Sequence, residues 1–511
     1  MRSAPASSIP RTAAEIGSPV PLERLVGGID VLLRAQGDFD AGAGAAAPSR
    51  RSGASPAPGP MITSITHDSR AVQPGALFCC LVGARSDGHD HAAEAVASGA
   101  VALLCERPLD LDVAQVVVAD ARAAMAHAAA AFFGHPSRRM AVVGVTGTNG
   151  KTTATHLLQA ILEADGRAAA VIGTLSGIHT TPESTDLQAR LAGLAAEGTD
   201  AVAMEVSSHA LVQHRVDATW FEVVAFINLS QDHLDYHHTM EDYFTAKASL
   251  FDPARARVGV VNVDDPWGRR LFDRLERTAL AVRPFSHADA VGLEVGRDGS
   301  TFTWDGAPVR LRLSGDFNVV NALTAAASAR ELGIAASTVA EGLGAVTSVP
   351  GRFERVDGGG TVAVIVDYAH TPAGLEQVLD AARRLAGDGV GAGRVIVVFG
   401  AGGDRDRAKR PAMGEVATCL ADVAVLTSDN PRSEDPLAII DEVQAGAAVA
   451  RPDVLIVEPD RRAAIGLAIG TARPGDVVVI AGKGHEPVQV WAAGRSVPFD
   501  DRQVAREALA R

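Results

Sequence analysis

The most regular feature of this chain is an alternation of short, continuous apolar runs with longer segments of helical spacing. Between residues 140 and 263 the runs read MAVVGV, AAAVIG, DAVAMEV, VVAFINL and VGVVNV. An unbroken apolar run predicts a strand buried on both faces, and helices between such strands predict parallel pairing. The segment 152–166 predicts one of these helices, because its aliphatic residues recur at helical spacing and it ends at Gly166. This region therefore predicts a doubly wound parallel sheet.

A second series of apolar runs repeats this pattern from residue 361 onward, and a shorter series precedes both. The later runs are TVAVIVDY, RVIVVFG, DVAVLTS, DVLIVE and DVVVIAG, and the earlier ones are ALFCCLVG, VALLCE and AQVVVA. The sequence therefore predicts an α/β protein of three domains. We expect a small N-terminal α/β domain at 61–139, a central doubly wound domain at 140–350 and a Rossmann-like C-terminal domain at 351–511.

The first 60 residues do not follow this pattern. The segment 21–35 predicts a short amphipathic helix, with apolar residues near helical spacing. Around it lie stretches rich in Ala, Gly, Pro and Ser, such as DAGAGAAAPSRRSGASPAPGP at 40–60. These stretches have too little apolar surface to order themselves, so residues 1–60 are expected to be a largely flexible extension.

Composition and charge narrow the class of protein. The 511 residues carry a net charge of −14, whereas nucleic-acid-binding proteins usually present a basic surface. No apolar run reaches the roughly 20 residues that span a bilayer, and the N-terminus lacks the apolar centre of a signal peptide. The four cysteines form neither a CxxC pair nor a zinc spacing and are expected to be buried thiols. We therefore expect a cytoplasmic protein that binds neither nucleic acid nor membrane.

The stretch GVTGTNGKTT, at 144–153, lies between a predicted strand and a predicted helix. Its glycines allow backbone N–H groups to approach an anion, and the helix N-terminus adds partial positive charge. Lys151 would reach the outer phosphates of a nucleotide, and Thr152 could bind Mg²⁺. The spacing departs from the common phosphate loop, because Val145 stands where the first glycine would be. An ordinary glycine-rich turn is the alternative. The pattern favours a P-loop for ATP, formed by Gly147, Thr148, Asn149, Gly150, Lys151, Thr152 and Thr153.

Two further motifs of the central region place polar side chains at the ends of predicted strands. AMEVSSHAL contains Glu205, and NLSQDHLDYHH contains His233. Ligands of open α/β sheets collect at the carboxyl ends of strands, and a carboxylate beside a nucleotide suits Mg²⁺. Imidazole is a less usual ligand for Mg²⁺, so DHLDYHH would also fit a zinc or hydrolase site, or hydrogen-bonded structural histidines. Spacing alone does not choose among these interpretations.

In the C-terminal region four apolar runs lead directly into polar motifs. These motifs are DYAHTP, GAGGDRDRAKRP, SDNPRSEDP and GKGHE. They combine cations such as Arg405 and Arg432 with anions such as Asp429 and Glu486. This mixture suits a zwitterion, because guanidinium groups bind carboxylates and acidic groups bind ammonium. An amino acid is therefore the expected ligand, with solvated surface charge as the alternative for the remaining charged residues.

Together these motifs resemble those of the Mur ligases. GTNGKTT, MEVSSHAL, NLSQDHLDYH, GDFNVVNALTA, PGRFERV, VDYAHTP, GAGGDRDRAKRP, DNPR and GKGHE occur in that family's order, from about Ile62 to the C-terminus. The resemblance implies ATP-dependent amide ligation in peptidoglycan precursor synthesis. It implies that 2,6-diaminopimelate, expected as the meso isomer, is added to the D-Glu γ-carboxyl of UDP-MurNAc-L-Ala-D-Glu through an acyl phosphate. The expected protein is a monomer whose partners are small-molecule substrates.

The resemblance also implies roles for individual residues. The residues matching the UDP-MurNAc-dipeptide site are Ser69, Ala84, Arg85, Ser86, Thr180, Thr181, Ser207, Gln213 and Arg215. Those adding to the ATP site are Asn321, Arg352 and Asp367. The implied Mg²⁺ ligands are Thr152, Glu205, His233 and Lys247, the last as a carbamate formed with CO₂. Lys151, Lys247, His233 and Glu205 are the expected catalytic residues. The residues matching the diaminopimelate site are Arg405, Asp429, Asn430, Pro431, Arg432, Gly482 and Glu486.

Arg432 is the residue that bears most directly on the amino acid used. Diaminopimelate carries a second carboxylate that lysine lacks, and a guanidinium fork fits that group. A lysine- or ornithine-adding ligase of the same family is the nearest alternative, and a P-loop nucleotide-binding protein of other activity is another. His370 and Glu486 are the candidates for a general base.

Overall fold

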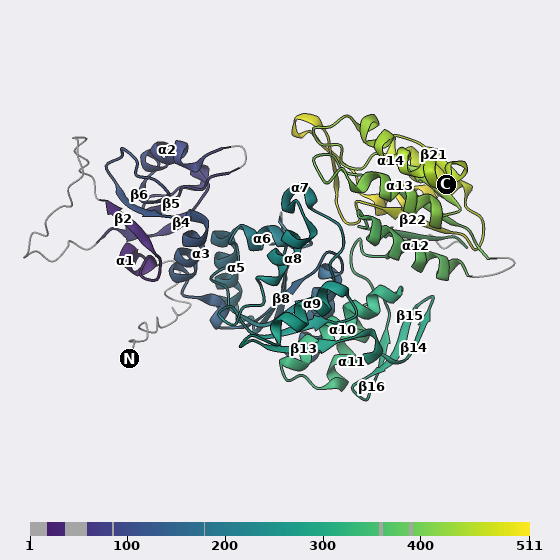
Figure 1. The fold of residues 1–511 in the computed structure, drawn as a ribbon, viewed down its shortest axis with the longest axis horizontal. Helices are drawn as coiled ribbons and strands as arrows, with labels where there is room; N and C mark the ends of the chain where they lie inside the picture. The colour runs from purple at the N-terminus through teal and green to yellow at the C-terminus, as the bar shows by residue number, and fades with distance from the viewer. Residues whose placement is uncertain are drawn as a thin grey trace, which may run out of the picture. The chain divides into compact units, whose positions relative to one another are not determined.

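The computed structural model describes residues 18–35, 59–83, 86–177, 179–356, 361–387 and 392–510. The chain divides into two compact units, and Figure 1 traces the helices and strands along it. One unit comprises Met1–Val142, Thr181–Val202 and Ser207–Phe221, and the other comprises Val143–Thr180, Ala203–Val206 and Glu222–Arg511. The predicted α/β class is confirmed by these elements, while the predicted domain boundaries at 60, 139 and 350 stay predictions.

The first unit is built around a five-stranded sheet of order β2-β7-β6-β5-β4. Alternate strand residues point to opposite faces, so Leu77 and Leu104 pack with α3 while Phe78 and Leu103 pack with α2. The elements up to this point are β1 Val20–Pro21, α1 Leu22–Leu25, β2 Val31–Ala35, β3 Met61–Ile62, β4 Ser64–Thr66, β5 Ala76–Cys79, α2 Ala92–Ala97, β6 Ala100–Cys105, β7 Ala114–Val118 and α3 Ala121–Phe132. Both faces of this sheet are therefore covered by apolar contacts.

The prediction of a helix over 21–35 is wrong. Helix α1 is a single turn at Leu22–Leu25, and Val31–Ala35 forms strand β2, which pairs antiparallel with β7. The physical reason is that Gly27 and Gly28 interrupt the helical spacing, and the following apolar residues gain a sheet partner in β7, far along the chain. Residues 18–35 thus belong to the ordered fold rather than to an extension.

The phosphate-loop sequence follows β8 in a six-stranded sheet of order β13-β12-β11-β8-β10-β9. Strand β8 is interior and pairs parallel with β11, as the apolar runs predict. Helix α4 begins at Lys151 and packs against α10 and α11. The elements are β8 Ala141–Thr146, α4 Lys151–Ala164, β9 Ala169–Ile172, α5 Ser184–Ala196, β10 Ala201–Glu205, α6 Ser208–Val212, β11 Phe221–Phe226, α7 Leu234–His237, α8 Met240–Ala248, β12 Ala256–Asn262, α9 Pro266–Leu275, β13 Ala281–Phe285, α10 Asp316–Glu331 and α11 Ala336–Ala345.

A three-stranded antiparallel sheet, which the sequence analysis did not predict, is inserted before α10. Its strands are β14 Val291–Gly296, β15 Gly299–Trp304 and β16 Ala307–Leu311. Strand β15 alternates buried and exposed residues, so one face of this sheet is packed and the other is solvated. It is a small, half-buried addition to the second unit.

The C-terminal sheet has the order β17-β18-β22-β19-β20-β21, and all its pairs are parallel except β17 with β18. Along β22, Val477 and Val479 pack beneath α12, α13 and α14, while Val478 and Ile480 pack against α15 and α16. This gives the three-layer α/β/α arrangement of a Rossmann-like fold. The elements are β17 Glu354–Val356, β18 Ala363–Asp367, α12 Pro372–Ala386, β19 Val395–Phe399, α13 Lys409–Leu420, β20 Val423–Leu426, α14 Pro436–Ala450, β21 Leu455–Val457, α15 Arg461–Thr471, β22 Val477–Ala481, β23 Val488–Val490, β24 Ser496–Pro498 and α16 Asp501–Leu509.

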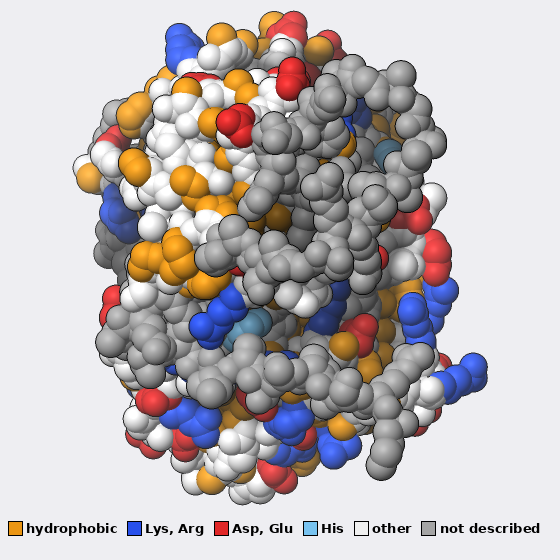
Figure 2. Space-filling model, turned by 90° about the vertical axis from the view of Figure 1, so that its left-hand side faces the viewer, with side chains coloured by type: hydrophobic (Ala, Val, Ile, Leu, Met, Phe, Trp, Pro, Cys, Tyr) orange, Lys and Arg blue, Asp and Glu red, His pale blue; other side chains and the backbone are white. Residues whose placement is uncertain are grey.

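The surface charge, the helices and the cysteines can each be compared with the sequence predictions. Basic and acidic side chains lie intermixed over the described part of the face in Figure 2. Across the described residues, no helix combines the length and apolar character needed to cross a bilayer. Cys79, Cys80 and Cys105 are buried as expected, whereas Cys419 is exposed, which corrects the prediction for that thiol. It lies near the end of α13 and faces solvent.

Candidate active site

The phosphate-loop sequence forms a tight turn between β8 and α4. Gly150 has φ +88°, a conformation that favours glycine, and a Cβ there would lie 2.1 Å from Asn321 Oδ1. Asn228, a residue that sequence reasoning missed, accepts through Oδ1 from Thr148 N at 3.1 Å and Asn149 N at 3.0 Å. Thr153 is buried in the first turn of α4. The Asn228 side chain thus holds the backbone of the loop, and the N–H groups in the first turn of α4 are the ones suited to an anion.

Two lysines converge on this loop. Lys151 Nζ donates to Gly147 O at 2.7 Å and Thr148 O at 2.9 Å, and Lys247 Nζ donates to the same Gly147 O at 2.9 Å. Burial lowers the pKa of Lys151. Burial and the positive charge of Lys151 hold the pKa of Lys247 well below its ordinary value. The prediction that both lysines belong to the nucleotide site therefore fits their positions.

Glu205 and Thr152 lie side by side at the ends of β10 and the loop. Thr152 Oγ1 donates to Glu205 Oε2 at 3.1 Å, and Thr174 N donates to Glu205 Oε1 at 2.8 Å. Glu205 is only 1% exposed. Within the described ranges, no group of three or more His, Cys, Asp or Glu side chains is arranged to hold a metal. This pair is thus a partial oxygen site, as suits Mg²⁺, which keeps water and phosphate ligands.

His233 lies beside Asp232, which has two further charged or titratable partners. It has φ +57° and its Nε2 lies 3.4 Å from Asp232 Oδ2. Asp232 also pairs with Lys409 Nζ at 3.0 Å and with His370 Nε2 at 3.5 Å. Burial alone would raise the pKa of Asp232, but its three partners hold that pKa well below the ordinary value. The pairing of Asp232 with Lys409 was not predicted, because the two residues are 177 residues apart in the sequence.

The other predicted ATP residues, Asn321, Arg352 and Asp367, lie near the loop or support a contact to it. Arg352 Nη2 donates to Thr152 Oγ1 at 2.9 Å. Asp367 accepts from Phe353 N and Ala369 N, each at 2.6 Å, and so fixes the backbone where β17 begins and β18 ends. Burial raises the pKa of Asp367. The structure thus brings Arg352 to the phosphate loop, with Asp367 holding the segment that carries it.

Four predicted residues of the UDP-MurNAc-dipeptide site are joined by hydrogen bonds. Ser207 N donates to Thr181 Oγ1 at 3.1 Å, Arg215 Nη1 donates to Thr181 O at 2.9 Å, and Arg215 Nη2 donates to Gln213 Oε1 at 2.7 Å. Glu183, which sequence reasoning missed, pairs with Arg215 at 2.8 Å. The arginine is therefore held in place by its neighbours.

The remaining predicted residues of that site are more dispersed. Thr180 Oγ1 lies 3.1 Å from Thr174 Oγ1. Ser69 begins a short 3₁₀ helix, and Ser86 Oγ lies 2.9 Å from His91 Nε2. Ala84 and Arg85 lie outside the described residues. The assignments of all these residues to a substrate stay predictions.

The predicted amino-acid pocket assembles at the carboxyl ends of β20 and β22. Asn430 Nδ2 donates to Glu486 Oε2 at 2.7 Å. Gly482 has φ +116°, and a Cβ there would lie 2.4 Å from Asp429 Oδ2, so glycine lets this carboxylate approach. Lys483 Nζ, missed from sequence, lies 3.3 Å from Glu486 Oε2. Asp429, Asn430, Gly482 and Glu486 thus form one polar site.

Arg405 and Arg432 flank Gly402 beside this pocket. A Cβ at Gly402 would lie 2.8 Å from Arg432 Nη1 and 3.7 Å from Arg405 Cγ. Arg432 Nη1 donates to Gly403 O at 2.7 Å, and Arg405 Nη1 donates to Asp404 O at 2.9 Å. Burial and repulsion by Arg405 lower the pKa of Arg432. No ion pair joins either guanidinium to a carboxylate among the described residues, so the two cations are placed for an external anion.

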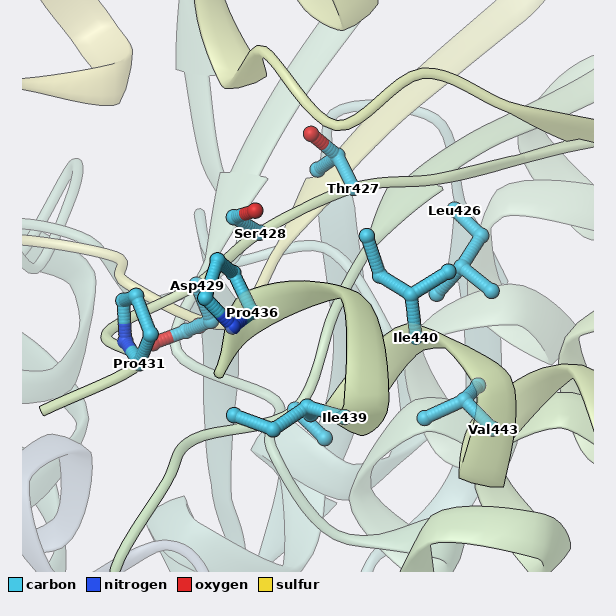
Figure 3. A pocket seen from close by; sticks show the side chains of 10 residues that line it. Leu426, Thr427, Ser428, Asp429, Pro431, Pro436, Ile439, Ile440 and Val443 are labelled. Atoms are coloured by element: carbon cyan, nitrogen blue, oxygen red, sulfur yellow. The ribbon is translucent and has the colours of Figure 1, made fainter. Parts of the chain in front are cut away.

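The DNPR segment, from Asp429 to Arg432, lies against α14 and has a constrained backbone. Asp429 and Pro431 line a hollow together with Ile439 and Ile440 of α14 (Figure 3). Arg432 itself has φ +52°, the left-handed region that a non-glycine residue adopts only when its surroundings impose it. The segment therefore has a defined backbone rather than that of a free loop.

A buried arginine, missed from sequence, supports the same loops. Arg410 is fully buried in α13 and donates through Nη2 to Glu434 Oε1 at 2.8 Å and to Gly402 O at 3.1 Å. Its Nη1 donates to Glu442 Oε2 at 2.8 Å. The Arg410 side chain lowers the pKa of Glu434 to about 2. This ion network connects α13, α14 and the loop of Arg405.

Comparison with known proteins agrees with this geometry. Three family models match: "Mur ligase family, catalytic domain" over residues 61–147, "Mur ligase middle domain" over 145–329 and "Mur ligase, glutamate ligase domain" over 351–484. A UDP-N-acetylmuramoyl-L-alanyl-D-glutamate–2,6-diaminopimelate ligase of Streptomyces avermitilis is 46% identical, covering 88% of this chain and 92% of the relative. The ligase of the same name from Syntrophomonas wolfei is 44% identical, covering 88% and 94%.

Solved structures show the same relationship. A structure of a UDP-N-acetylmuramoyl-L-alanyl-D-glutamate–2,6-diaminopimelate ligase is 32% identical, with TM-score 0.61, and covers 88% of this chain and 95% of that one. MurF ligase from Thermotoga maritima, solved in complex with ADP, shares the fold at 19% identity and TM-score 0.59, covering 88% and 96%. The long matches in sequence and fold place this chain in the Mur ligase family.

Proposed function

We propose that this protein is an ATP-dependent amide ligase that adds 2,6-diaminopimelate to the D-Glu γ-carboxyl of UDP-MurNAc-L-Ala-D-Glu. The observation that carries the amino-acid specificity is the pair Arg405 and Arg432 beside the pocket of Asp429, Asn430 and Glu486. Two guanidinium groups without a carboxylate partner among the described residues suit an amino acid with an additional carboxylate. The names of the relatives, at 44% and 46% identity, support the same substrate.

The phosphate loop would bind ATP as a substrate. Backbone N–H groups of the loop and the N-terminus of α4 stabilise phosphate oxygens. The Lys151 ammonium now donates to Gly147 O and Thr148 O, and it lies where it can turn to an outer phosphate. The carboxylate of the dipeptide substrate attacks the γ-phosphorus to form an acyl phosphate, while ADP leaves. The growing negative charge is offset by the fixed cations of this site.

Thr152 and Glu205 would hold Mg²⁺, which when bound neutralises phosphate charge. Their oxygens lie 3.1 Å apart in a buried position that suits a hard cation. His233 is proposed as a further ligand on the resemblance, although in this structure it lies against Asp232. Thr152 and Glu205 also orient each other, so they position the loop for the transfer.

Lys247 is proposed to carry a carbamate. It is 1% exposed, and no carboxylate among the described residues forms an ion pair with its ammonium group. A neutral amine is the form that attacks CO₂, and the lowered pKa of Lys247 favours that form. Conversion to a carbamate would replace the cation of Lys247 by an anion beside Lys151. This would relieve the repulsion between the two ammonium groups that meet at Gly147 O.

The amine of diaminopimelate then attacks the acyl carbon, and phosphate leaves. Of the two candidates named for proton removal, only Glu486 lies in the amino-acid pocket, and it accepts from Tyr368, Asn430 and Lys483. We assign Glu486 to binding the ammonium group. His370 Nδ1 donates to the Tyr368 carbonyl oxygen at 2.7 Å, and its Nε2 faces Asp232, so His370 belongs to the cluster of Lys409.

Phosphate release measured with purified protein tests this proposal. The assay contains ATP, Mg²⁺ and UDP-MurNAc-L-Ala-D-Glu, with meso-diaminopimelate, LL-diaminopimelate, lysine, ornithine or no amino acid. We expect sustained turnover with diaminopimelate only and a tripeptide product of the matching mass. Preference for lysine or ornithine would identify the other type of ligase, and equal turnover without any amine would favour a nucleotide hydrolase.

A further inference from the structure

Tyr368, at the end of β18, lies between the nucleotide loop and the amino-acid pocket. The guanidinium carbon of Arg352 is 4.4 Å from the centroid of its ring, and its hydroxyl donates to Glu486 Oε1 at 3.3 Å. At the far ends, Arg352 Nη2 donates to Thr152 Oγ1 at 2.9 Å, and Glu486 Oε2 accepts from Asn430 Nδ2 at 2.7 Å. Four consecutive contacts therefore join the phosphate loop to the DNPR segment.

The ring of Tyr368 has little room to move independently of these partners. His370 lies 4.7 Å from it edge-on, and His485 lies 5.4 Å away, centroid to centroid. Gly484 approaches so closely that a Cβ there would be 2.9 Å from Tyr368 Cβ. Burial and the Glu486 carboxylate raise the pKa of Tyr368, so the phenol keeps its proton and remains a donor. A displacement of Arg352 is thus transmitted to the ring and to Glu486.

We expect Arg352 to exchange one partner for another when a nucleotide binds, which would give the row of contacts two states. In this structure it donates to the Thr152 hydroxyl, while its buried Nε has no hydrogen-bond partner among the described residues. A nucleotide that engages Thr152 displaces Arg352 from that hydroxyl and offers phosphate oxygens instead. The cation–π contact with Tyr368 then changes, because its strength depends on the position of the guanidinium over the ring.

We propose that Tyr368 couples the two sites, so that nucleotide binding positions Glu486 for the incoming amino acid. This inference rests on the proposed function, which assigns ATP to the loop and diaminopimelate to the pocket. Coupling between two binding sites is reciprocal, so the amino acid must tighten nucleotide binding by the same factor. Tyr368 acts through Arg352 and Glu486 and is therefore a positioning residue.

Calorimetric titration of meso-diaminopimelate tests the coupling. The dissociation constant is measured with and without Mg²⁺ and a non-hydrolysable ATP analogue, with UDP-MurNAc-L-Ala-D-Glu present throughout. For the wild type we expect the analogue to tighten binding about tenfold. Tyr368→Leu loses the ring and the hydroxyl. In this variant we expect the ratio of the dissociation constants without and with the analogue to fall to within about twofold of unity. Tyr368→Phe keeps the ring over Arg352 and is expected to retain part of the ratio.

The ratio of the two dissociation constants separates coupling from a purely structural effect. A distorted pocket raises both dissociation constants and leaves their ratio unchanged. Trp220→Leu is the matched control, since it removes a ring that lies 4.0 Å from the Arg138 guanidinium in the other unit, and should keep the wild-type ratio. If Tyr368→Leu does not fold, Tyr368→Phe tests the coupling instead, by a ratio lower than that of the wild type. If the Tyr368 variants keep the wild-type ratio while phosphate release still depends on diaminopimelate, the coupling through Tyr368 is wrong and the proposed function stands. Absence of that release in the wild type overturns the proposed function as well.

Discussion

The nucleotide loop and the amino-acid pocket are stabilised by different kinds of contact. The loop is fixed through its backbone: Asn228 accepts from two backbone N–H groups, and Lys151 donates to two backbone carbonyls. The pocket is fixed by charged side chains, through Arg410 with its two glutamates and Lys483 with Glu486. A backbone cradle recognises phosphate of any nucleotide, whereas a charged network recognises one arrangement of carboxylate and ammonium.

This difference has a consequence for substitutions. A change in the loop should reduce turnover equally with every amino acid, because it acts on the step before the amine enters. A change in the pocket should alter the preference among amino acids or the response to pH, and should leave nucleotide binding in place.

Lys151→Ala should lower kcat by about 10³-fold with every amino acid, because it removes a cation that offsets charge during phosphoryl transfer. Phosphate release measures this effect. Binding of UDP-MurNAc-L-Ala-D-Glu, measured by calorimetry, is the control and should stay unchanged. Activity within tenfold of the wild type would show that Lys151 does not reach the phosphates.

Lys247→Ala should lower kcat by about 10²-fold, with partial recovery on addition of formate or acetate, because a short carboxylate can replace the carbamate oxygens. Lys151→Ala is the matched control and should show no such recovery. In the wild type, ¹³CO₂ should give a carbamate signal by ¹³C NMR that Lys247→Ala lacks. Because the pKa of Lys247 is lowered, the neutral amine and hence this signal should persist to lower pH than for an ordinary lysine.

Arg432→Ala should raise KM for diaminopimelate by about 100-fold, because a charged hydrogen bond to the second carboxylate is lost. The dissociation constant of the ATP analogue should not change. Since Arg432 has φ +52°, Arg432→Asn separates backbone strain from loss of charge: asparagine tolerates this conformation but cannot pair with a carboxylate. Unchanged diaminopimelate kinetics in both variants would remove the specificity argument.

Glu434→Gln should reduce the free energy of unfolding by about 1–2 kcal/mol at pH 7, because it breaks the ion pair with buried Arg410. The pKa of Glu434 is lowered from 4.5 to about 2, so the stabilisation is fully present above pH 4.5 and is lost as pH falls towards 2. Urea unfolding at several pH values measures the difference, which should shrink below pH 4.5. Glu415→Gln, an exposed change on α13, the helix that carries Arg410, is the control. Equal pH profiles for both variants would contradict the role of the network.

The fold was predictable wherever the signal was local. Continuous apolar runs such as RVIVVFG, which becomes β19 Val395–Phe399, reveal buried parallel strands because both faces are covered. Strand β2 was not predictable as a strand, since its pairing with β7 depends on a partner far along the chain. The half-buried sheet of β14–β16 was missed as well, because its alternation is short and polar.

In the candidate site, too, residues within a local motif were predictable and contacts between distant segments were not. Gly150 and Lys151 were evident from their motif, because the geometry of a phosphate loop is set within a few residues. The ion pair of Asp232 with Lys409 and the contact of Arg352 with Tyr368 join distant segments, so only the fold reveals them. His233 shows the limit of motif reasoning: its motif contains Asp232, but only the fold shows that Lys409 and His370 also contact that carboxylate.

The exposed thiol of Cys419 offers a direct way to observe this molecule. Cys79, Cys80 and Cys105 are buried, so a maleimide dye should attach at a single position without any substitution. That position is on α13, the helix whose first residue, Lys409, pairs with Asp232. A fluorophore there would report, within one native polypeptide, whether the helix changes its surroundings as each substrate arrives.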